Sequence, residues 1–448
     1  MSEHDLAGEI WKSPLPSLLD ISVARRAGQR GLDEDIVAKD SQDDSFQSIS
    51  ISPSLSQHGV GRPFEDREKA RLFMHYIHDL STWLMLRIAQ VDVSDKRRHF
   101  GTEVPKRACH SPLLAYAIIA LASRSLCSIK GTDDSKPSTY YSHALQILIP
   151  ILGSSTEALN EEVLAAIVIL RQYEEMTDTD FGVHLSGSSK LLNSMFSLAS
   201  KGGLGEAASW IVLRQDYWVA LVKSQPLSIN LDSYKGSSSF VVSDPECLAN
   251  RAVFLCAQAC AYAFQPTMVR DLDRWNKLNQ ELGNWLVSNP WHADPLWVDP
   301  PHDTSANGSA FPTVWMTHPA HVVGYQHYSL ARMILHIFNP YLSKPSLDTF
   351  RRRRESEQAV LDNFRLLLGL AISNPLVVNA SFTAAHALRA CGIYLTDPKE
   401  QRESLDLLDK LHQRTGWRTK DLEEQLNSQW SQDSCNSAFG YLFAEARK

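Results

Sequence analysis

Two groups of side chains in this sequence have residue types and spacings that suit metal binding. Cys256 and Cys260 lie four residues apart, which places both thiols on one face of a helix. Thiolates at that spacing could hold a metal ion if a second pair lay opposite, because soft ligands suit Zn²⁺ and Cu⁺. Free cysteine is also among the most buried residue types, and Phe254 and Ala257 surround the pair. We therefore favour core packing over metal binding for these two cysteines.

The second group consists of four histidines in one region: His318, His321, His327 and His336. Neutral imidazoles are common metal ligands, and His318 and His321 could share a helix face. No carboxylate stands at a matching offset in the sequence. Helix capping and helix packing are therefore the favoured roles.

Aromatic residues mark a third candidate, in the segment 285–327: Trp285, Trp291, Trp297 and Trp315. Aromatic walls suit pockets for apolar small molecules. The same side chains could instead pin an irregular segment onto neighbouring helices, and we favour this second interpretation. If the chain were an enzyme, this Trp- and His-rich segment would be its pocket.

Short signatures of common reactions are missing. Residues 187–189 lack the frame of a serine nucleophile elbow, and residues 202–205 lack the preceding strand and the Lys-Ser/Thr pair of a phosphate-binding loop. No His-Glu-x-x-His motif and no pair of Cys-x-x-Cys motifs occurs. The sequence therefore predicts no enzyme, with no catalytic residue, no cofactor-binding residue and no metal ligand.

Basic residues gather at two places. The strongest run is formed by four arginines: Arg351, Arg352, Arg353 and Arg354. Such a run could be read by the nuclear import machinery or could contact phosphates, although a solvated helix start also explains it. A weaker patch, residues 96–98 with 106–107, is expected in a loop.

Composition limits the class of protein. The chain has 448 residues, 44% of them hydrophobic, and a net charge of -7, so bulk electrostatics give no attraction to nucleic acid. Its seven cysteines are odd in number and irregularly spaced, which is typical of buried thiols in a reducing compartment. No secretory signal is found, and no apolar run reaches the about 18 residues that cross a bilayer. We expect a soluble intracellular protein that does not bind membranes.

Hydropathy patterning divides the chain near residue 63. Residues 1–63 are rich in Ser and Asp and are predicted to be a mostly disordered arm, which could be phosphorylated. From residue 64 to 448, apolar side chains recur at spacings of three and four, as at Phe73, Ile77, Leu80 and Leu84. This pattern predicts an all-α fold, a large irregular helical bundle or array of roughly a dozen helices.

The predicted helices cover residues 113–126, 140–151, 161–176, 181–198, 206–223, 245–264, 268–286, 321–338, 348–372, 380–395, 399–413 and 418–430. Ser111 before Pro112 is a typical helix start. Residues 288–319 carry many prolines and are expected to be irregular. The alternation typical of strands is not found.

Six segments, in their order along the chain, carry a resemblance to a known family: 111–123, 140–145, 162–174 with 184–187, 210–216, 327–340 and 415–430. Characteristic stretches are Ser-Pro-Leu-Leu-Ala-Tyr-Ala-Ile-Ile in the first and Thr-Gly-Trp-Arg in the last. Together they resemble the fungal-specific transcription factor domain that follows binuclear zinc clusters, in the group that includes ARCA-like regulators. The resemblance extends over most of residues 65–430.

The resemblance implies a nuclear, non-catalytic transcriptional regulator of a metabolic or secondary-metabolite gene set in a fungus. Its partners would be other transcription regulators or a dimer partner that supplies a zinc cluster, together with a small-molecule effector. The family's cysteine-rich DNA reader has no counterpart here, because Cys109 is the first cysteine, so strong direct DNA binding is not expected. A truncated gene product, a natural loss of the cluster and a change of task remain open. The alternative function is an enzyme or accessory protein of a fungal biosynthetic pathway on the same scaffold.

Overall fold

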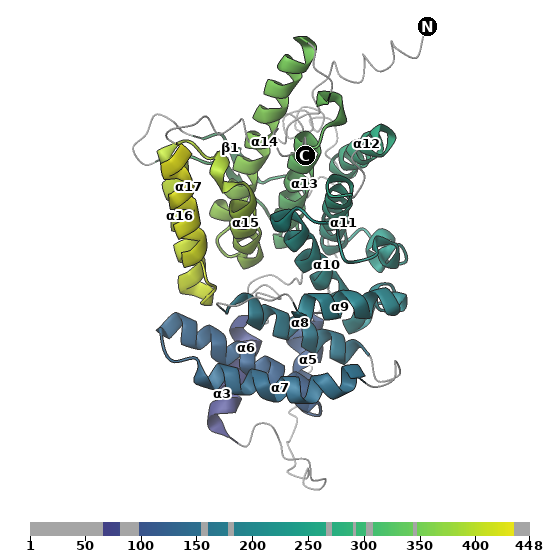
Figure 1. Ribbon diagram of the computed structural model, residues 1–448, viewed down its shortest axis with the longest axis vertical. Coiled ribbons are helices and arrows are strands. Elements are labelled where there is room, and N and C mark those ends of the chain that lie inside the picture. The colour runs from purple at the N-terminus through teal and green to yellow at the C-terminus, as the bar shows by residue number, and fades with distance from the viewer. Residues whose placement is uncertain are drawn as a thin grey trace, which may run out of the picture. The chain divides into compact units, whose positions relative to one another are not determined.

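The computed structural model describes residues 66–80, 98–153, 160–177, 183–265, 271–289, 293–301, 308–343 and 347–433. The chain divides into two units, Met1–Glu65 and Asp66–Lys448, and the described residues belong to the second. They form fourteen α-helices and one small sheet, so the predicted all-α class is confirmed (Figure 1). The predicted N-terminal arm lies outside the described residues.

The first group of helices packs around α6 and is drawn in purple and blue in Figure 1. Its members are α3 (Arg67–His75), α5 (His99–Ala108), α6 (Pro112–Lys130), α7 (Ser135–Gly153) and α8 (Glu161–Glu175). Helix α6 begins at Pro112, as predicted, and is buried along most of its length because nearly every side chain in its first three turns is apolar. Its 19 residues are long and apolar enough to cross a membrane, which corrects the expectation on length, but 67% of the apolar window is buried within the protein.

The remaining helices form a second group. Helix α10 belongs to it and contacts α5 and α8 of the first group as well as α9, α11 and α15. The members of the second group are α9 (Val183–Ser194), α10 (Gly203–Lys223), α11 (Pro245–Ala263), α12 (Leu272–Ser288), α13 (Pro319–Ile337), α14 (Leu347–Ser373), α15 (Val378–Cys391), α16 (Pro398–Thr415) and α17 (Lys420–Asp433). Helix α13 lies against α11 and α14 and is buried on nearly all sides. Helix α10 thus joins the first group of helices to the second.

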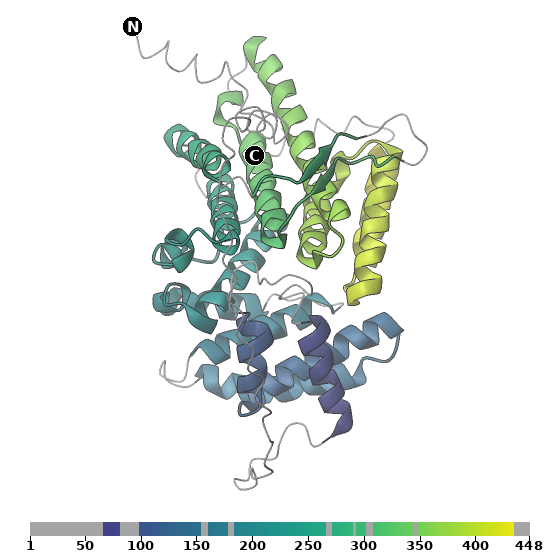
Figure 2. The same ribbon diagram turned by 180° about the vertical axis from the view of Figure 1, so that it is seen from behind.

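A two-stranded sheet interrupts the segment that was expected to be irregular, so that expectation was wrong at this point. Strands β1 (Trp297–Asp299) and β2 (Thr313–Trp315) pair in antiparallel fashion, with Trp297 opposite Trp315. The hairpin lies along α14, as the view from behind shows (Figure 2), and the Asn374 side chain donates to the Val314 carbonyl at 2.7 Å. Each strand has only three residues and no tight turn joins them, so neither alternation nor a turn motif is visible in the sequence.

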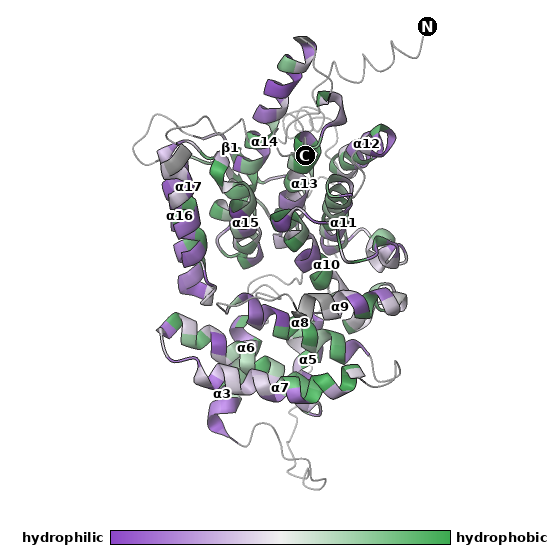
Figure 3. Cartoon of the chain, viewed as in Figure 1, coloured by the Kyte–Doolittle hydropathy of each residue, from purple (hydrophilic) through white to green (hydrophobic). Residues whose placement is uncertain are grey.

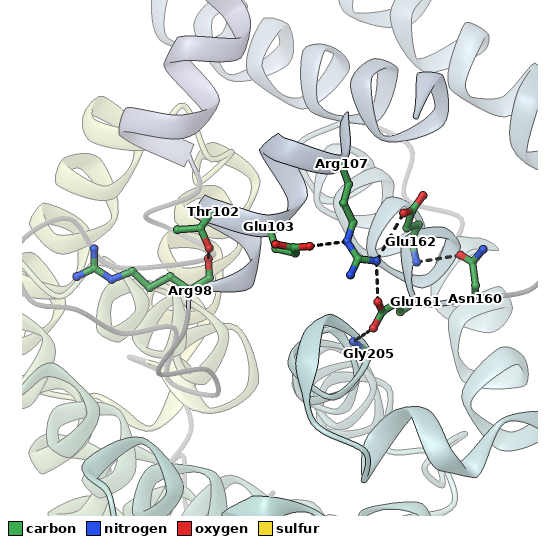
Figure 4. Close-up of polar contacts among 8 residues, drawn as sticks. All are labelled: Arg98, Thr102, Glu103, Arg107, Asn160, Glu161, Glu162 and Gly205. Atoms are coloured by element: carbon green, nitrogen blue, oxygen red, sulfur yellow. Dashed lines mark hydrogen bonds and ion pairs between the residues drawn. The ribbon is translucent and has the colours of Figure 1, made fainter. Parts of the chain in front are cut away.

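Helix α5 was also missed, and the basic loop expected at residues 106–107 is wrong. Arg107 lies in α5, where its Nε donates to Glu103 at 2.9 Å and its Nη1 to Glu161 of α8 at 2.6 Å (Figure 4). The other carboxylate oxygen of Glu161 accepts from the backbone N–H of Gly205 at 3.1 Å. Pro105 within the helix is the reason why the sequence did not predict it.

The turn between α16 and α17 is fixed to α6 by two hydroxyl groups. Ser125 donates to the Thr415 carbonyl at 2.9 Å, and Ser128 donates to the Gly416 carbonyl at 2.6 Å. Gly416 has φ +71°, and a Cβ there would stand 2.6 Å from the Ser125 carbonyl oxygen, so only glycine fits. This attachment brings the residues after Gly416 close to α8 and α10.

Candidate functional site

A cavity of about 360 Å³ lies between α8, α10, α13, α15 and the residues that lead into α17. This volume falls within the range of small-molecule sites. Two helices supply most of the wall. Helix α10 contributes Ile211, Gln215 and Trp218, which are spaced by four and three residues, and α15 contributes His386 and Arg389 with a similar spacing. Each helix therefore presents one face to the cavity.

Aromatic rings form one wall of this cavity. The Trp218 and His386 rings are stacked, with centroids 5.0 Å apart and an angle of 22° between their planes. Trp417 meets His386 edge-on at 6.4 Å and meets Phe382 edge-on at 4.9 Å. The Trp417 carbonyl accepts from Nδ1 of His412 at 2.8 Å, which fixes the position of its backbone. The cavity therefore has an aromatic side.

Charged residues around the cavity are mostly basic. Two acidic residues, Glu175 and Asp421, line it together with five basic ones: Arg171, Arg214, Lys223, Arg389 and Arg418. Both carboxylates are already paired, because Glu175 accepts from Arg171 at 3.2 Å and Asp421 accepts from Arg418 at 3.0 Å. The lining therefore carries an excess of positive charge.

Arg389 is a partly buried cation of this lining without a paired carboxylate. Among the described residues, no hydrogen bond or ion pair engages its guanidinium. Burial lowers the pKa of Arg389, and the more distant Asp421 offsets this effect only in part. A partly buried guanidinium with five donor N–H groups and no acceptor is costly, so this position favours the arrival of an anion.

The Gln215 side chain is a second polar group without a partner. It is 6% exposed, and neither its Nε2 nor its Oε1 has a hydrogen-bond partner among the described residues. Buried polar groups in proteins are nearly always hydrogen-bonded, and an exception calls for a specific explanation. Because Gln215 lines the cavity, a molecule bound there can supply the missing partners.

Two histidines next to the cavity are held in the neutral form. His327 donates from Nδ1 to the Val323 carbonyl at 2.7 Å, and its Nε2 accepts from the Tyr217 hydroxyl at 2.5 Å. Burial lowers the pKa of His327 to about 4. Burial, aided by the guanidiniums of Arg389 and Arg171, lowers the pKa of His386 to about 3. The positive surroundings of the cavity therefore act on its own titratable groups.

The metal-binding candidates from the sequence lie in pairs and do not combine into a larger group of ligands among the described residues. Cys256 and Cys260 are fully buried in the core on α11, as the favoured interpretation predicted. His318 and His321 lie together at the start of α13, with ring centroids 5.4 Å apart, and His318 caps the helix by accepting from the Ala320 N–H. His327 and His336 lie further along the helix, where His336 contacts Ser356. In the part of the chain that the structure describes, no three His, Cys, Asp or Glu side chains form a group that could hold a metal ion.

The tryptophans of segment 285–327 also do not form a pocket among the described residues. Trp285 is buried and donates from Nε1 to the Leu248 carbonyl at 2.9 Å, and the space beside it is only about 10 Å³, at most the volume of one water molecule. Trp297 and Trp315 are half exposed on the hairpin, and Trp291 lies outside the described residues. The geometry therefore gives no support to the alternative of an enzyme with its pocket in this segment.

The four arginines predicted for nuclear import lie at the start of α14, a hydrophilic part of that helix in Figure 3. Arg351 pairs with Asp348 at 2.9 Å, and Arg352 pairs with the same carboxylate at 2.7 Å. Arg353 donates to the Leu342 carbonyl at 3.4 Å, whereas Arg354 is exposed and has no ion pair with a described residue. The run therefore stands on a helix and is partly neutralised by its neighbours.

Apart from His327, sequence reasoning did not single out the residues that line the cavity. Gln215 and Trp417 fall inside two of the six segments that carry the family resemblance, but they were quoted there for their order along the chain. A usable signal was present in α15, where His386 and Arg389 interrupt a stretch of small apolar residues. Polar residues on an otherwise buried helix face indicate either a partner or a ligand.

The comparison with known protein families agrees with the resemblance. The family described as the fungal specific transcription factor domain matches residues 71–217, about a third of the chain, which run from α3 to within α10. The match includes the first four of the six segments and stops before the last two. No curated protein and no solved structure matches the chain. Residues 71–217 are thus similar to the fungal specific transcription factor domain family.

Proposed function

We propose that this protein is a transcriptional regulator that acts in the nucleus of a fungus by binding other molecules. The observation that carries the proposal is the family match over residues 71–217. The matched helices share a core with the helices that follow, because α10 contacts both α8 and α11. A regulator of this kind has no need of catalytic residues, since it acts through the surfaces that it hides or exposes.

Effector binding gives this regulator a means of control. The cavity is bounded by α8 and α10 on one side and by α15 and the turn before α17 on the other. A ligand that contacts both sides stabilises the arrangement of these helices that it binds more tightly, by the difference in its affinity for the alternative arrangements. We propose that such an effector controls access to a partner, either another transcription regulator or a protein that supplies a zinc cluster for DNA binding. The regulated genes would serve a metabolic or secondary-metabolite pathway.

A tethering experiment tests the proposed function directly. The chain is fused to a DNA-binding domain of known target and expressed in a fungal host that carries a reporter gene under that target. We expect the fusion to change reporter expression several-fold relative to the DNA-binding domain alone. A fluorescently tagged chain should also accumulate in the nucleus. Unchanged reporter expression, together with a tagged protein confined to the cytosol, would contradict the proposal.

The arginine run supplies a narrower test of localisation. Replacing Arg351, Arg352, Arg353 and Arg354 by glutamine should abolish nuclear accumulation if this run is the import signal. A variant with four exposed basic residues replaced elsewhere, namely Lys130, Lys235, Lys277 and Lys420, serves as the matched control. Equal loss in both variants would indicate an effect of net charge instead of a specific signal.

A further inference from the structure

We propose that the cavity between α10 and α15 binds a small organic anion, whose charged group contacts Arg389 and Gln215 and whose ring-shaped apolar body packs on the aromatic wall. The inference deepens the proposed function, because it names the chemical class of the effector. The binding itself can be measured on the purified chain and does not depend on any effect on genes.

The charge of the ligand follows from the unpaired cation. The carboxylates of Glu175 and Asp421 are engaged by Arg171 and Arg418, and Asp421 offsets the charge of Arg389 only in part. An anionic group placed at Arg389 can accept two parallel N–H donors from its planar guanidinium. A neutral ligand would leave this cation uncompensated, and a cation would add repulsion.

The polar end of the ligand also follows from Gln215. Its Nε2 can donate to an oxygen of the anionic group, and its Oε1 can accept from a hydroxyl, an amide N–H or a bound water molecule. This observation is independent of the charge argument, since it concerns an uncharged side chain on a different helix. Both residues line the same cavity.

The apolar end of the ligand follows from the aromatic residues of the lining. Trp218, His386 and Trp417 offer ring faces and edges, which favour a flat, conjugated body over a flexible aliphatic chain. A volume of about 360 Å³ accommodates a compact molecule with one or two fused rings. The ligand is therefore a ring-bearing carboxylate or phosphate ester.

Calorimetric titration of the full chain with naphthoate tests this proposal. Naphthalenemethanol has the same ring system without the charge, and acetate has the charge without the rings. We expect naphthoate to bind at least tenfold more tightly than either of these two compounds. Naphthyl phosphate, as a further titrant, distinguishes the two anionic groups: whichever of the two binds more tightly identifies the group for which the cavity is built.

Variants assign the binding to the cavity. Arg389→Gln should weaken naphthoate binding by about 10- to 100-fold and leave naphthalenemethanol binding nearly unchanged, because a charge-assisted hydrogen bond is lost. Arg389→Lys keeps the charge and should restore part of the affinity. Arg354→Gln removes an exposed arginine outside the cavity and is the matched control. Gln215→Leu should weaken naphthoate binding by a smaller factor, and it provides a second test if Arg389→Gln does not fold.

Three results would overturn the proposal: no binding of naphthoate or naphthyl phosphate at millimolar concentration, equal affinity for naphthalenemethanol, or an equal loss of affinity in Arg354→Gln. None of these results bears on the tethering experiment. Conversely, a silent reporter with intact naphthoate binding would contradict the regulatory function and leave the ligand class standing.

Discussion

Two regions of this protein each place an arginine between helices. In one region the charge of the arginine is paired with carboxylates, and in the other it is not. In the first region, Arg107 of α5 contacts Glu103, Glu161 and Glu162, and Glu161 in turn binds the start of α10 (Figure 4). In the second region, Arg389 of α15 has no hydrogen bond or ion pair with any described residue. Both positions are only partly exposed, so solvent does not remove the difference.

The difference separates a region in which polar groups are paired within the fold from a region in which some polar groups lack a partner. Around α6, apolar packing and paired charges leave few unmet interactions, which is expected of a region that only has to hold together. Around the cavity, an unpaired cation, an unpaired amide and two neutral histidines remain. Natural proteins retain such local conflicts at functional sites, because the partner that resolves them arrives from outside.

The closely packed region should give the largest loss of stability on truncation. Leu164 of α8 has no exposed surface, and Leu164→Ala should lower the free energy of unfolding by about 2–5 kcal/mol, because a cavity remains where the side chain was. Urea denaturation of the purified chain measures this change. Leu376→Ala is the control, since Leu376 is 56% exposed, and its effect should stay within about 0.5 kcal/mol. Similar losses in both variants would mean that α8 is not part of the core.

The same contrast explains which elements the sequence could predict. Helix α6 was predicted correctly because a proline start and a run of apolar residues are local signals, and twelve of its residues are buried. Helices α8 and α10 to α17 were likewise predicted at nearly their observed bounds. Elements without such a local signal were missed: α5 contains Pro105, and the hairpin pairs two strands of three residues across a long connection.

The cavity could not be predicted, because it depends on residues far apart in the chain. Arg171 and Trp417 line the same space, although about half of the sequence separates them. Their proximity depends on hydrogen bonds from the Ser125 and Ser128 hydroxyls to the turn at Gly416. No local sequence pattern predicts hydrogen bonds between residues so far apart in the chain. The tryptophans that the sequence did single out are packed against helices or lie on the hairpin.

Acid should destabilise the cavity side before the closely packed side. His327 and His386 have folded-state pKa values of about 4 and about 3, below the usual 6.5, so the unfolded chain binds their protons first. Their contribution to stability is complete above pH 6.5 and is lost as the pH falls from 6.5 toward 4. In this window, each histidine should lower the free energy of unfolding by roughly 1 to 2 kcal/mol for each pH unit of acidification.

Hydrogen exchange followed by mass spectrometry at pH 7, 6 and 5 locates this effect, after correction for the intrinsic exchange rate. Amides of α15 and of residues 415–422 should lose protection before those of α6 and α8. His327→Gln should be less stable than the parent chain at pH 7 but should show a shallower decline toward pH 5. If the decline of His327→Gln matches that of the parent chain, the neutral histidine is not the source of the acid sensitivity.

Removing the paired arginine should have a moderate effect. Arg107→Gln leaves three carboxylates close together without their shared cation, and it should lower the free energy of unfolding by about 1–2 kcal/mol. The loss should decrease as salt is added, because salt screens the remaining repulsion. Lys136→Gln, which breaks an exposed pair with Glu68, is the control and should give no measurable change. A salt-independent loss in Arg107→Gln would point to lost side-chain packing in place of lost charge pairing.

The smallest expected effect has the opposite sign and tests the comparison most sharply. Gln215→Leu replaces an unpaired buried amide by an apolar side chain of similar size, and it should raise the free energy of unfolding by about 1 kcal/mol in the absence of ligand. Gln326 is the matched control, because it is also buried but its Nε2 donates to the carbonyls of Leu367 and Ala380 at 3.0 and 3.1 Å. Its Oε1, like both polar atoms of Gln215, has no hydrogen-bond partner among the described residues.

Gln326→Leu should therefore lower the free energy of unfolding, by about 1–3 kcal/mol, since two buried carbonyls lose a donor. Urea denaturation of both variants, each with and without naphthoate, separates the two roles of a buried glutamine. If Gln215→Leu raises the free energy of unfolding and also weakens naphthoate binding, then the Gln215 side chain serves ligand binding and lowers the stability of the fold. If Gln215→Leu lowers the free energy of unfolding as much as Gln326→Leu does, then Gln215 has a structural hydrogen-bond partner. In that case the polar groups around the cavity are paired as completely as those around Arg107.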